Sequence, residues 1–299
     1  LKAIGDKKID VVISDQRMPH MLGTEFLKET MGVNSDNVRI ILTGYTDVKD
    51  LITCINEGLI YRYMVKPWDK QEMLAVAKQA IEKVFHDRTL RQVVPNQIVE
   101  RLYPDGLQAA KPGDAREISC ACMFVDIFEF TQMADGMTPD DAFQFLTSFM
   151  GTVGPRIRQH HGFIDKYLGD GIMAVFDRDG HYAEDAVACA VDLMSSIEEY
   201  NAVHRSDKIP DFRAGGDPRR PINVGIGINY GSVILGTIGF PGRIDFTVLG
   251  DVVNTSSRIQ ELTKLYGAHL IVHEDIASKL VPEKFDRRYL GTVPVREKK

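Results

Sequence analysis

Short continuous runs of apolar residues constrain what the first part of this chain can fold into. Three of them, at residues 9–13, 38–42 and 61–65, have the length of strands that are buried on both faces of a sheet. Stretches with helical patterns lie between them, at 23–31 and 47–57. Strands and helices that alternate in this way predict a parallel α/β sheet.

A long helix is predicted after the third run. Asp69 and Glu72 resemble a capping box at its start, and apolar residues recur at helical spacing as far as Phe85. The helix can continue to Val94, because Pro95 is the residue that would end it. The pattern fits a lever that leads into a second domain and, equally, a helix packed on the first sheet.

A second domain is predicted after a stretch rich in proline and glycine at residues 95–117. Its expected elements are a strand at 118–127, a helix from 138 to about 159, strands at 163–168 and 172–176, a helix at 183–204, strands at 222–229 and 232–238, and a helix at 251–266. Residues 224–240, which include five glycines and no charge, are interpreted as a β-hairpin. The order βαββαβ, with elements added at its end, is that of a ferredoxin-like α+β fold.

That topology is expected to bring two distant carboxylates together. The first and third strands of such a sheet are antiparallel neighbours, so Asp126 at the end of the first lies beside Asp170 at the start of the third. Two adjacent carboxylates repel each other unless a cation lies between them, and oxygen ligands suit Mg²⁺ or Mn²⁺. Taken singly, Asp170 also fits the turn of a hairpin and Asp126 an ordinary strand end, so it is their pairing that favours a metal site.

The last predicted helix carries a complementary positive charge. Asn254 and Arg258 are four residues apart and share one face. An apolar stripe lies roughly a quarter turn away from them, and it consists of Val252, Ile259, Leu262 and Tyr266. An arginine that faces a cleft can hold a phosphate group with two hydrogen bonds, and an arginine on a solvated surface is the equally supported alternative.

Three blocks of the sequence resemble the signature blocks of the class III adenylyl/guanylyl cyclase catalytic domain. They are 122–131 (CMFVDIFEFT), 165–173 (DKYLGDGIM) and 243–258 (RIDFTVLGDVVNTSSR), and the resemblance extends over about 118–299. It implies conversion of ATP to 3′,5′-cyclic AMP and pyrophosphate by in-line attack, with two metal ions, Mg²⁺ or Mn²⁺, in each active site. Because one chain carries residues that the family places on opposite subunits, the resemblance also implies a homodimer with its active sites at the subunit interface.

The resemblance implies a role for individual residues of the predicted site. Asp126, Ile127 and Asp170 would bind the metal ions. Asn254 would orient the ribose, and Arg258 would stabilise the reacting phosphate.

The resemblance also implies how the purine is read. Lys166 can donate a hydrogen bond to adenine N1, and Thr247 can accept one from the 6-amino group. Guanylyl cyclases usually have Glu and Cys at these positions, so adenine is favoured. Two positions depart from the family pattern. Glu129 stands where glycine is frequent, and Lys298 is the candidate for a second phosphate-binding lysine although Glu297 replaces the expected glycine before it.

Residues 10–19 (DVVISDQRMP), 42–44 (LTG) and 66–68 (KPW) resemble the third, fourth and fifth strand ends of a response-regulator receiver domain, which has a doubly wound, flavodoxin-like fold. The resemblance implies that a group of four residues forms the phosphorylation switch: Asp15 as the phosphoryl acceptor, Thr43 as the neighbouring hydroxyl, Lys66 as the partner of the phosphate and Tyr63 as the rotating aromatic side chain. Taken singly, Asp15 also fits a loop acid and Lys66 a solvated charge at a strand end.

The stretch before Asp10 has room only for the tail of a helix, so we expect a partial receiver that lacks the first two strands and their acidic pair for Mg²⁺. The expected organisation is a partial receiver at 1–88, a helical and Pro/Gly-rich linker at 89–117 and a cyclase domain at 118–299. We expect a cognate histidine kinase to phosphorylate Asp15 in the intact protein and so to shift the cyclase dimer through the 69–94 helix.

Composition excludes several classes of protein. The chain has 36 basic and 42 acidic residues, a net charge of −6, which argues against nucleic-acid binding through bulk positive charge. Four cysteines without a CxxC motif make neither a disulfide framework nor a zinc site. No apolar stretch has the length of a membrane span and the first residues lack the pattern of a signal peptide, so we expect a cytoplasmic protein.

The function expected from these observations is that of an adenylyl cyclase regulated by receiver phosphorylation. A guanylyl cyclase is one alternative. A signalling module that binds nucleotide without turning it over is another, and the complete set of Asp126, Asp170, Asn254 and Arg258 speaks against it.

Overall fold

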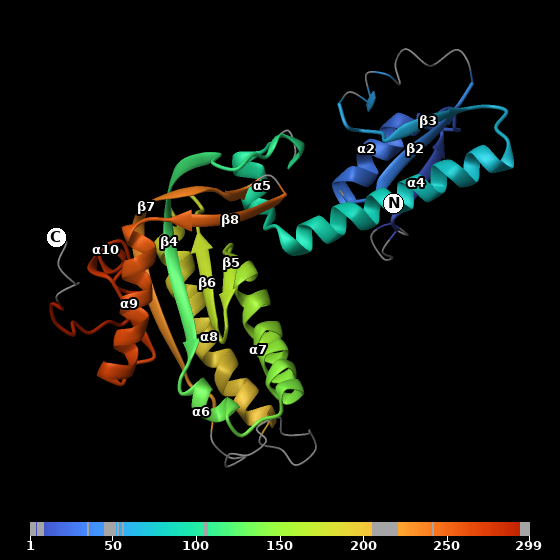
Figure 1. Ribbon diagram of the computed structural model, residues 1–299. Helices are drawn as coiled ribbons and strands as arrows, with labels where there is room; N and C mark the ends of the chain where they lie inside the picture. The colour runs from blue at the N-terminus through green and yellow to red at the C-terminus, as the bar shows by residue number, and fades with distance from the viewer. Residues whose placement is uncertain are drawn as a thin grey trace. The chain divides into compact units, whose positions relative to one another are not determined.

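The computed structural model describes residues 9–34, 36–44, 57–104, 107–204, 221–240 and 242–293, together with residues 4, 52, 54 and 55. The chain divides into two compact units, Leu1–Val94 and Pro95–Lys299, which are described in turn (Figure 1).

The N-terminal unit is built on a parallel sheet, as its apolar runs predicted. The strands β1 (Val11–Asp15), β2 (Val38–Thr43) and β3 (Arg62–Val65) lie side by side in that order. The helices α2 (Gly23–Val33) and α4 (Lys70–Val93) bury two separate apolar clusters against the sheet. The first cluster includes Val12, Leu27, Ile41 and Ile60, and the second Val38, Ile40, Met64, Val76, Ala80 and Val84. The helix predicted at 47–57 lies largely outside the described residues.

The long helix α4 begins where its sequence predicted. The Asp69 side chain accepts hydrogen bonds from the backbone N–H groups of Gln71 and Glu72, which would otherwise have no partner in the first turn. The first half of α4 packs on the sheet, whereas Phe85 and Val93 are 61% and 76% exposed. Packing on the sheet extends to Val84, and Arg88 pairs with Asp10 just before β1, so it is the last turn of the helix, around Val93, that the sheet does not cover.

The second unit contains the predicted ferredoxin-like sheet. Its strands are β4 (Ala115–Ile127), β5 (Phe163–Leu168), β6 (Gly171–Phe176), β7 (Val224–Phe240), β8 (Arg243–Leu249) and β9 (Leu270–Val272). The order is β5-β6-β4-β7-β8, and β9 pairs in parallel with β7. The helices are α5 (Asn96–Leu102), α6 (Phe130–Ala134), α7 (Pro139–Gln159), α8 (Tyr182–His204), α9 (Asp251–Tyr266) and α10 (Glu274–Ala277), and η2 (Leu107–Ala109) is a 3₁₀ turn.

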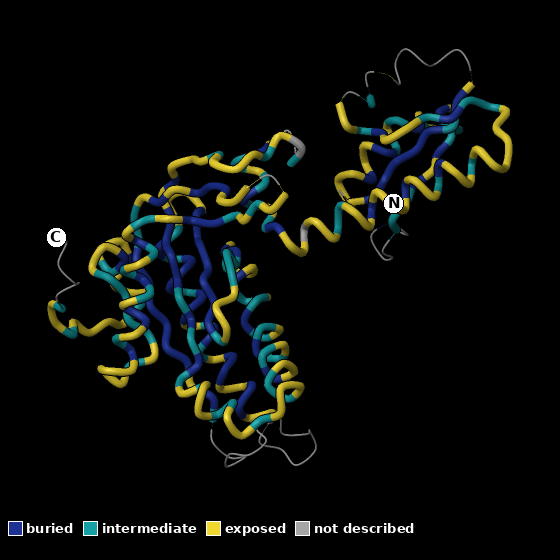
Figure 2. The backbone as a smooth tube through the Cα atoms, viewed as in Figure 1, coloured by how far each residue is buried: buried dark blue, intermediate teal, exposed yellow. Residues whose placement is uncertain are grey.

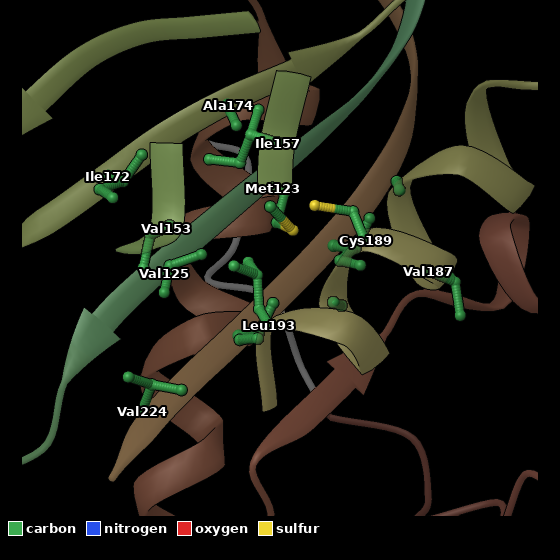
Figure 3. Close-up of a cluster of buried hydrophobic side chains, with 14 of the residues drawn as sticks. Met123, Val125, Val153, Ile157, Ile172, Ala174, Val187, Cys189, Leu193 and Val224 are labelled. Atoms are coloured by element: carbon green, nitrogen blue, oxygen red, sulfur yellow. The ribbon is translucent and has the colours of Figure 1, made fainter. Parts of the chain in front are cut away.

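The alternation of side chains along β4 divides this unit into two apolar clusters. The larger cluster holds Met123 and Val125 together with Val153 and Ile157 of α7 and Leu193 of α8 (Figure 3). The smaller cluster takes the alternate β4 residues, including the fully buried Cys120 and Cys122, and residues of α5, β8 and α9. Figure 2 shows the central strands of the sheet, β6, β4 and the first part of β7, as largely buried. Asp126 follows the parity of Cys120 and Cys122, so it belongs to the sheet face that α7 and α8 leave uncovered.

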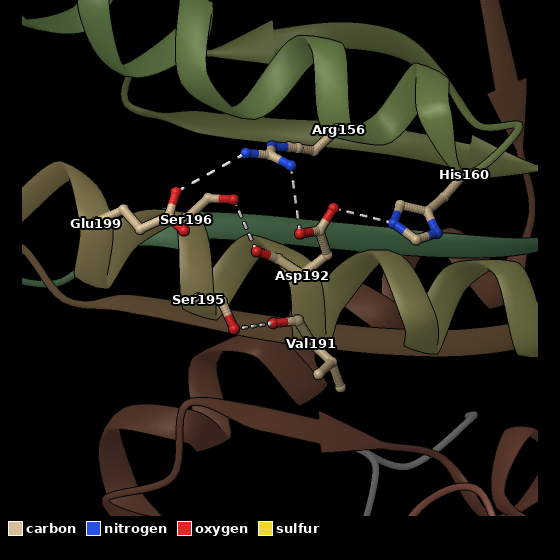
Figure 4. Close-up of polar contacts among 7 residues, drawn as sticks. All are labelled: Arg156, His160, Val191, Asp192, Ser195, Ser196 and Glu199. Carbon is tan, nitrogen blue, oxygen red and sulfur yellow. Dashed lines mark hydrogen bonds and ion pairs between the residues drawn. The ribbon is translucent and has the colours of Figure 1, made fainter.

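Polar contacts join α7 to α8 outside this core (Figure 4). Asp192 of α8 lies 3.0 Å from His160 Nε2 and 3.5 Å from Arg156 Nη1, and Glu199 lies 4.0 Å from Arg156 Nη2. These side chains are partly solvated, so the pairs add little stability beyond the apolar contacts. These contacts hold α7 and α8 together and have no link to the carboxylates of β4 and β6.

The predicted hairpin at 224–240 is wrong. β7 is one continuous strand that pairs with β4 along its length, from Ile127 opposite Val224 to Ala115 opposite Gly236. The chain reverses only after Phe240, where the previously unrecognised strand β8 pairs back onto β7.

The glycines of β7 allow close contact with α9 instead of making a turn. A Cβ atom at Gly227 would lie 2.2 Å from the backbone nitrogen of Gln260, and one at Gly225 would lie 2.2 Å from Thr263 Oγ1. The glycines therefore let β7 approach α9 more closely than any larger residue at these positions would allow.

Gly227→Ala is accordingly expected to lower the free energy of unfolding by about 3 kcal/mol, because the methyl group forces β7 and α9 apart. Urea denaturation followed by circular dichroism measures the change. The matched control is Gly151→Ala in α7, where nothing lies within 4 Å of the added Cβ atom. The control should stabilise the protein by up to about 1 kcal/mol, because alanine favours a helix, and equal effects of both changes would contradict the packing argument.

The segment expected to be a linker is structured where the structure describes it. Ile98 of α5 is fully buried in the smaller apolar cluster of the second unit, and β4 already begins at Ala115. Among the described residues, none of the helices combines the length and the apolarity needed to cross a membrane.

Candidate active site

The two distant carboxylates meet as the topology predicted. Asp126 is the second-last residue of β4, and Asp170 lies in the turn just before β6. Antiparallel pairing of Val125 with Ile172 brings these two ends together. The two carboxyl groups lie near enough to each other for Asp126 to shift the pKa of Asp170.

Their proximity changes the acidity of Asp170. Partial burial and the neighbouring Asp126 carboxylate raise the pKa of Asp170 to about 6. Proximity of two acids therefore costs free energy near neutral pH, and a bound cation would offset that cost.

Two residues of α9 that the sequence did not suggest also reach Asp126. Lys264 Nζ lies 2.8 Å from Asp126 Oδ2, and Gln260 Nε2 lies 3.4 Å from the same oxygen. The two side chains are four residues apart and share a face of the helix. Helical spacing would have grouped them, but nothing in the sequence indicates that this face meets β4.

The donor set fits a hard divalent cation. Two carboxylates present oxygen ligands, and Ile127, whose hydrocarbon side chain is buried in the core, can offer only its backbone carbonyl. Mg²⁺ and Mn²⁺ accept such a partial set, since they retain positions for water and phosphate oxygens. In the part of the chain that the structure describes, no group of three or more His, Cys, Asp or Glu side chains is placed so that it could hold a metal ion by itself.

Asn254 and Arg258 are exposed on α9. Arg258 is two residues from Gln260, a rotation of about 200° around the helix axis, so it points away from the Asp126 of its own chain.

The predicted apolar stripe on α9 is only partly correct. Val252 and Ile259 are buried, but Tyr266 is 41% exposed. The rest of the buried face is polar and consists of Ser256, Gln260 and Thr263. These residues pack against the glycines of β7, where small size and backbone contact matter more than apolarity.

The two residues expected to read the purine are in contact. Lys166 Nζ on β5 donates a 2.6 Å hydrogen bond to Thr247 Oγ1 on β8. Asp165, which the sequence did not single out, lies 3.3 Å from Lys166 Nζ and accepts a 3.2 Å hydrogen bond from Thr247 Oγ1. Burial raises the pKa of the Asp165 carboxyl, and the Lys166 charge opposes that rise. Alternation along a strand would place Asp165 and Lys166 on opposite faces, but a register shift between Ile164 and Lys166 removes the alternation.

Glu129 adopts the left-handed region, with φ 57° and ψ 27°, just before α6. This conformation favours glycine, which is the residue frequent at this position in the family that the sequence resembles. Lys298 lies outside the described residues.

A second polar constellation lies at the carboxyl ends of the parallel strands in the N-terminal unit. Asp15 ends β1, and its Oδ1 lies 2.7 Å from Lys66 Nζ, just after β3. Thr43 ends β2 and is 2% exposed, and Tyr63 of β3 packs against the apolar cluster under α2. Carboxyl ends of parallel strands meet at one edge, which is where α/β folds place ligands.

Comparison with known proteins agrees with both resemblances. A family model described as "Adenylate and Guanylate cyclase catalytic domain" matches residues 114–299, and one described as "Response regulator receiver domain" matches residues 1–78. An adenylate cyclase of Anabaena cylindrica is 37% identical over 203 residues, which make up 68% of this chain and 39% of the relative. This chain thus spans well under half the length of that relative.

Solved structures show the same fold. A bacterial light-regulated adenylyl cyclase has a TM-score of 0.59 at 20% identity, covering 74% of this chain and 61% of that chain. The guanylyl cyclase Cya2 has a TM-score of 0.50 at 26% identity, covering 63% of this chain and 90% of that chain.

Proposed function

The chain belongs to the adenylate and guanylate cyclase catalytic-domain family and carries a response-regulator receiver domain at its N-terminal end, and from this premise we propose that it converts ATP to 3′,5′-cyclic AMP and pyrophosphate. The observation that carries the proposal is the meeting of Asp126 and Asp170 at the ends of β4 and β6. A nucleoside triphosphate is highly anionic, so two carboxylates can bind it only through cations that lie between them and the phosphates.

The residues divide the chemistry between them. Asp126, Asp170 and the Ile127 carbonyl would hold two divalent ions, which when bound neutralise phosphate charge and lower the pKa of the ribose 3′-hydroxyl. Lys264, whose Nζ lies 2.8 Å from Asp126 Oδ2, supplies a positive charge beside that carboxylate. In the reaction the 3′-hydroxyl loses its proton, its oxygen bonds to the α-phosphorus, and the bond to pyrophosphate breaks.

A second copy of the chain completes the site. Arg258 points away from the carboxylates of its own chain, so an Arg258 that stabilises charge on the reacting phosphate must come from a partner subunit. The same applies to Asn254, which shares its face and would orient the ribose. A two-fold homodimer provides two equivalent sites of this kind.

Contacts at Lys166 and Thr247 support adenine over guanine. Adenine presents an acceptor at N1 and a donor at its 6-amino group, which match the ammonium and the hydroxyl oxygen. Guanylyl cyclase activity is the alternative, because the fold is shared with a guanylyl cyclase.

Product formation from Mn²⁺-ATP and Mn²⁺-GTP, measured side by side, tests the proposal. We expect cyclic AMP to form with the higher kcat/KM. Preference for GTP would replace the proposal with guanylyl cyclase activity, and binding of ATP without turnover would make the domain a non-catalytic signalling module.

Receiver phosphorylation is proposed to regulate this activity. The Lys66 ammonium beside Asp15 would pair with a phosphoryl group on that carboxylate, as a cognate histidine kinase would supply it, and the α4 helix would pass the change to the cyclase dimer. We expect acetyl phosphate to change the cyclase rate several-fold in the full-length protein and to leave Asp15→Asn unchanged. Equal rates with and without acetyl phosphate, in both the wild-type protein and Asp15→Asn, would contradict regulation by phosphorylation.

A further inference from the structure

Asp165 is a buried acid whose carboxylate is only partly satisfied by its neighbours. Its side chain is fully shielded from solvent, and its Oδ1 atom has no hydrogen-bond partner among the described residues. A buried carboxylate oxygen without a hydrogen-bond partner costs stability. The register shift in β5 nevertheless directs it to Lys166 and Thr247, where a regular strand would turn it to the other face.

The hydrogen bonds of these three residues leave one defined pattern for a ligand. The Thr247 hydroxyl has a single proton, which it donates to Asp165 Oδ2, and one of its lone pairs accepts from Lys166. Its second lone pair remains free to accept. Lys166, whose side chain is 34% exposed, uses two of its three N–H groups on Thr247 and Asp165 and keeps one to donate.

From this arrangement we infer that Asp165 is a specificity-determining positioning residue, which holds the Thr247 hydroxyl as an acceptor and thereby selects adenine over guanine. The inference rests on the proposed function and deepens it. As a carboxylate Asp165 can only accept a hydrogen bond, so the Thr247 hydroxyl donates its proton to it. The other acceptor within reach of that hydroxyl, the Val248 carbonyl, lies at the longer distance of 3.4 Å. Guanine presents an acceptor, O6, where adenine presents a donor, so a fixed acceptor at Thr247 repels it.

Asp165→Asn tests the inference. The amide has nearly the same shape but can donate to Thr247, which frees the hydroxyl proton to turn toward O6 of guanine. We expect the ratio of kcat/KM for ATP to that for GTP to fall roughly tenfold, the value of one misdirected hydrogen bond. The control is Asp185→Asn, which changes another buried acid, paired with Arg178 at 2.8 Å; it should leave the ratio unchanged.

Two further measurements exclude a merely structural role. Because Asp165 acts through Thr247, the ratio in Thr247→Val should equal that in the double variant Asp165→Asn/Thr247→Val. In the unmodified protein, purine riboside triphosphate lacks only the 6-amino group of ATP, and we expect its kcat/KM to be about tenfold lower. The second measurement needs no folded variant.

The outcomes separate the inference from the proposed function. A wild-type protein without a preference for ATP removes the proposed function. A wild-type preference for ATP that Asp165→Asn retains overturns only the role assigned to Asp165. Equal use of ATP and purine riboside triphosphate removes the hydrogen bond from the 6-amino group to Thr247, and with it the role assigned to Asp165, but leaves the cyclase activity itself standing.

Discussion

Asp170→Asn is expected to lower the rate of cyclic AMP formation by about a thousandfold while it stabilises the metal-free protein at neutral pH. The rate falls because the site loses one of its two carboxylate ligands, and metal-assisted charge stabilisation is worth several kcal/mol, at about 1.4 kcal/mol per tenfold in rate. Stability rises because an uncharged amide avoids the two effects that raise the pKa of Asp170 to about 6, partial burial of its charge and repulsion by Asp126. Loss of function and gain of stability in one variant would identify acids held together for a ligand.

The pH dependence of that gain has a definite sign. Between its ordinary pKa near 3.8 and about 6, the Asp170 carboxyl binds a proton in the folded protein that the unfolded chain releases. Wild-type stability therefore falls as pH rises through this interval and stays at its lower level above it. We expect Asp170→Asn to be more stable by about 1 kcal/mol at pH 7 to 8, since solvent screening of a half-exposed group reduces the effect, and to show no advantage near pH 4.

Thermal unfolding of metal-free protein at several pH values, with and without Mg²⁺, measures this prediction beside the cyclase assay. Asp179→Asn is the control, because Asp179 is an exposed acid in the loop between β6 and α8. Its rate and its unfolding temperature should match the wild type. A stability gain of Asp170→Asn that is the same at pH 4 and pH 8 would contradict the repulsion between the two acids.

Asp126→Ala and Arg258→Ala are each expected to be almost inactive alone, and to recover about a quarter of the wild-type activity when they are co-expressed in equal amounts. Random pairing makes about half of the dimers mixed, and each mixed dimer has one site in which both the acids and the arginine are intact. Activity of differently tagged, co-purified subunits measures the recovery.

Pairing two changes on the same half of the site provides the control. Asp126→Ala with Asp170→Asn should show no recovery, because every possible site then lacks an acid. Recovery by that pair, or none by Asp126→Ala with Arg258→Ala, would contradict a site shared between two copies. The orientation of Arg258, about 200° around α9 from Gln260, is the reason to expect the shared site.

Local patterns in the sequence predicted most elements correctly. The apolar runs of the first unit, the Asp69 cap of α4 and the order β6-β4-β7 in the second sheet all follow from short-range periodicity and from topology rules. Those rules are also why the sequence alone could predict that Asp126 and Asp170 lie side by side. The error at β7 arose where glycine has two meanings, since the sequence alone does not separate a turn from close contact with a helix.

By itself, the sequence determined the two folds, the two families and the acids that meet between β4 and β6, because strand order dictates which strand ends are neighbours. Only the tertiary structure decided that Lys264 pairs with Asp126 and that Asp165 turns toward Thr247. The first contact depends on how closely α9 packs on the glycines of β7, and the second on a register shift in β5. Both depend on packing between elements distant in sequence, which no local periodicity records.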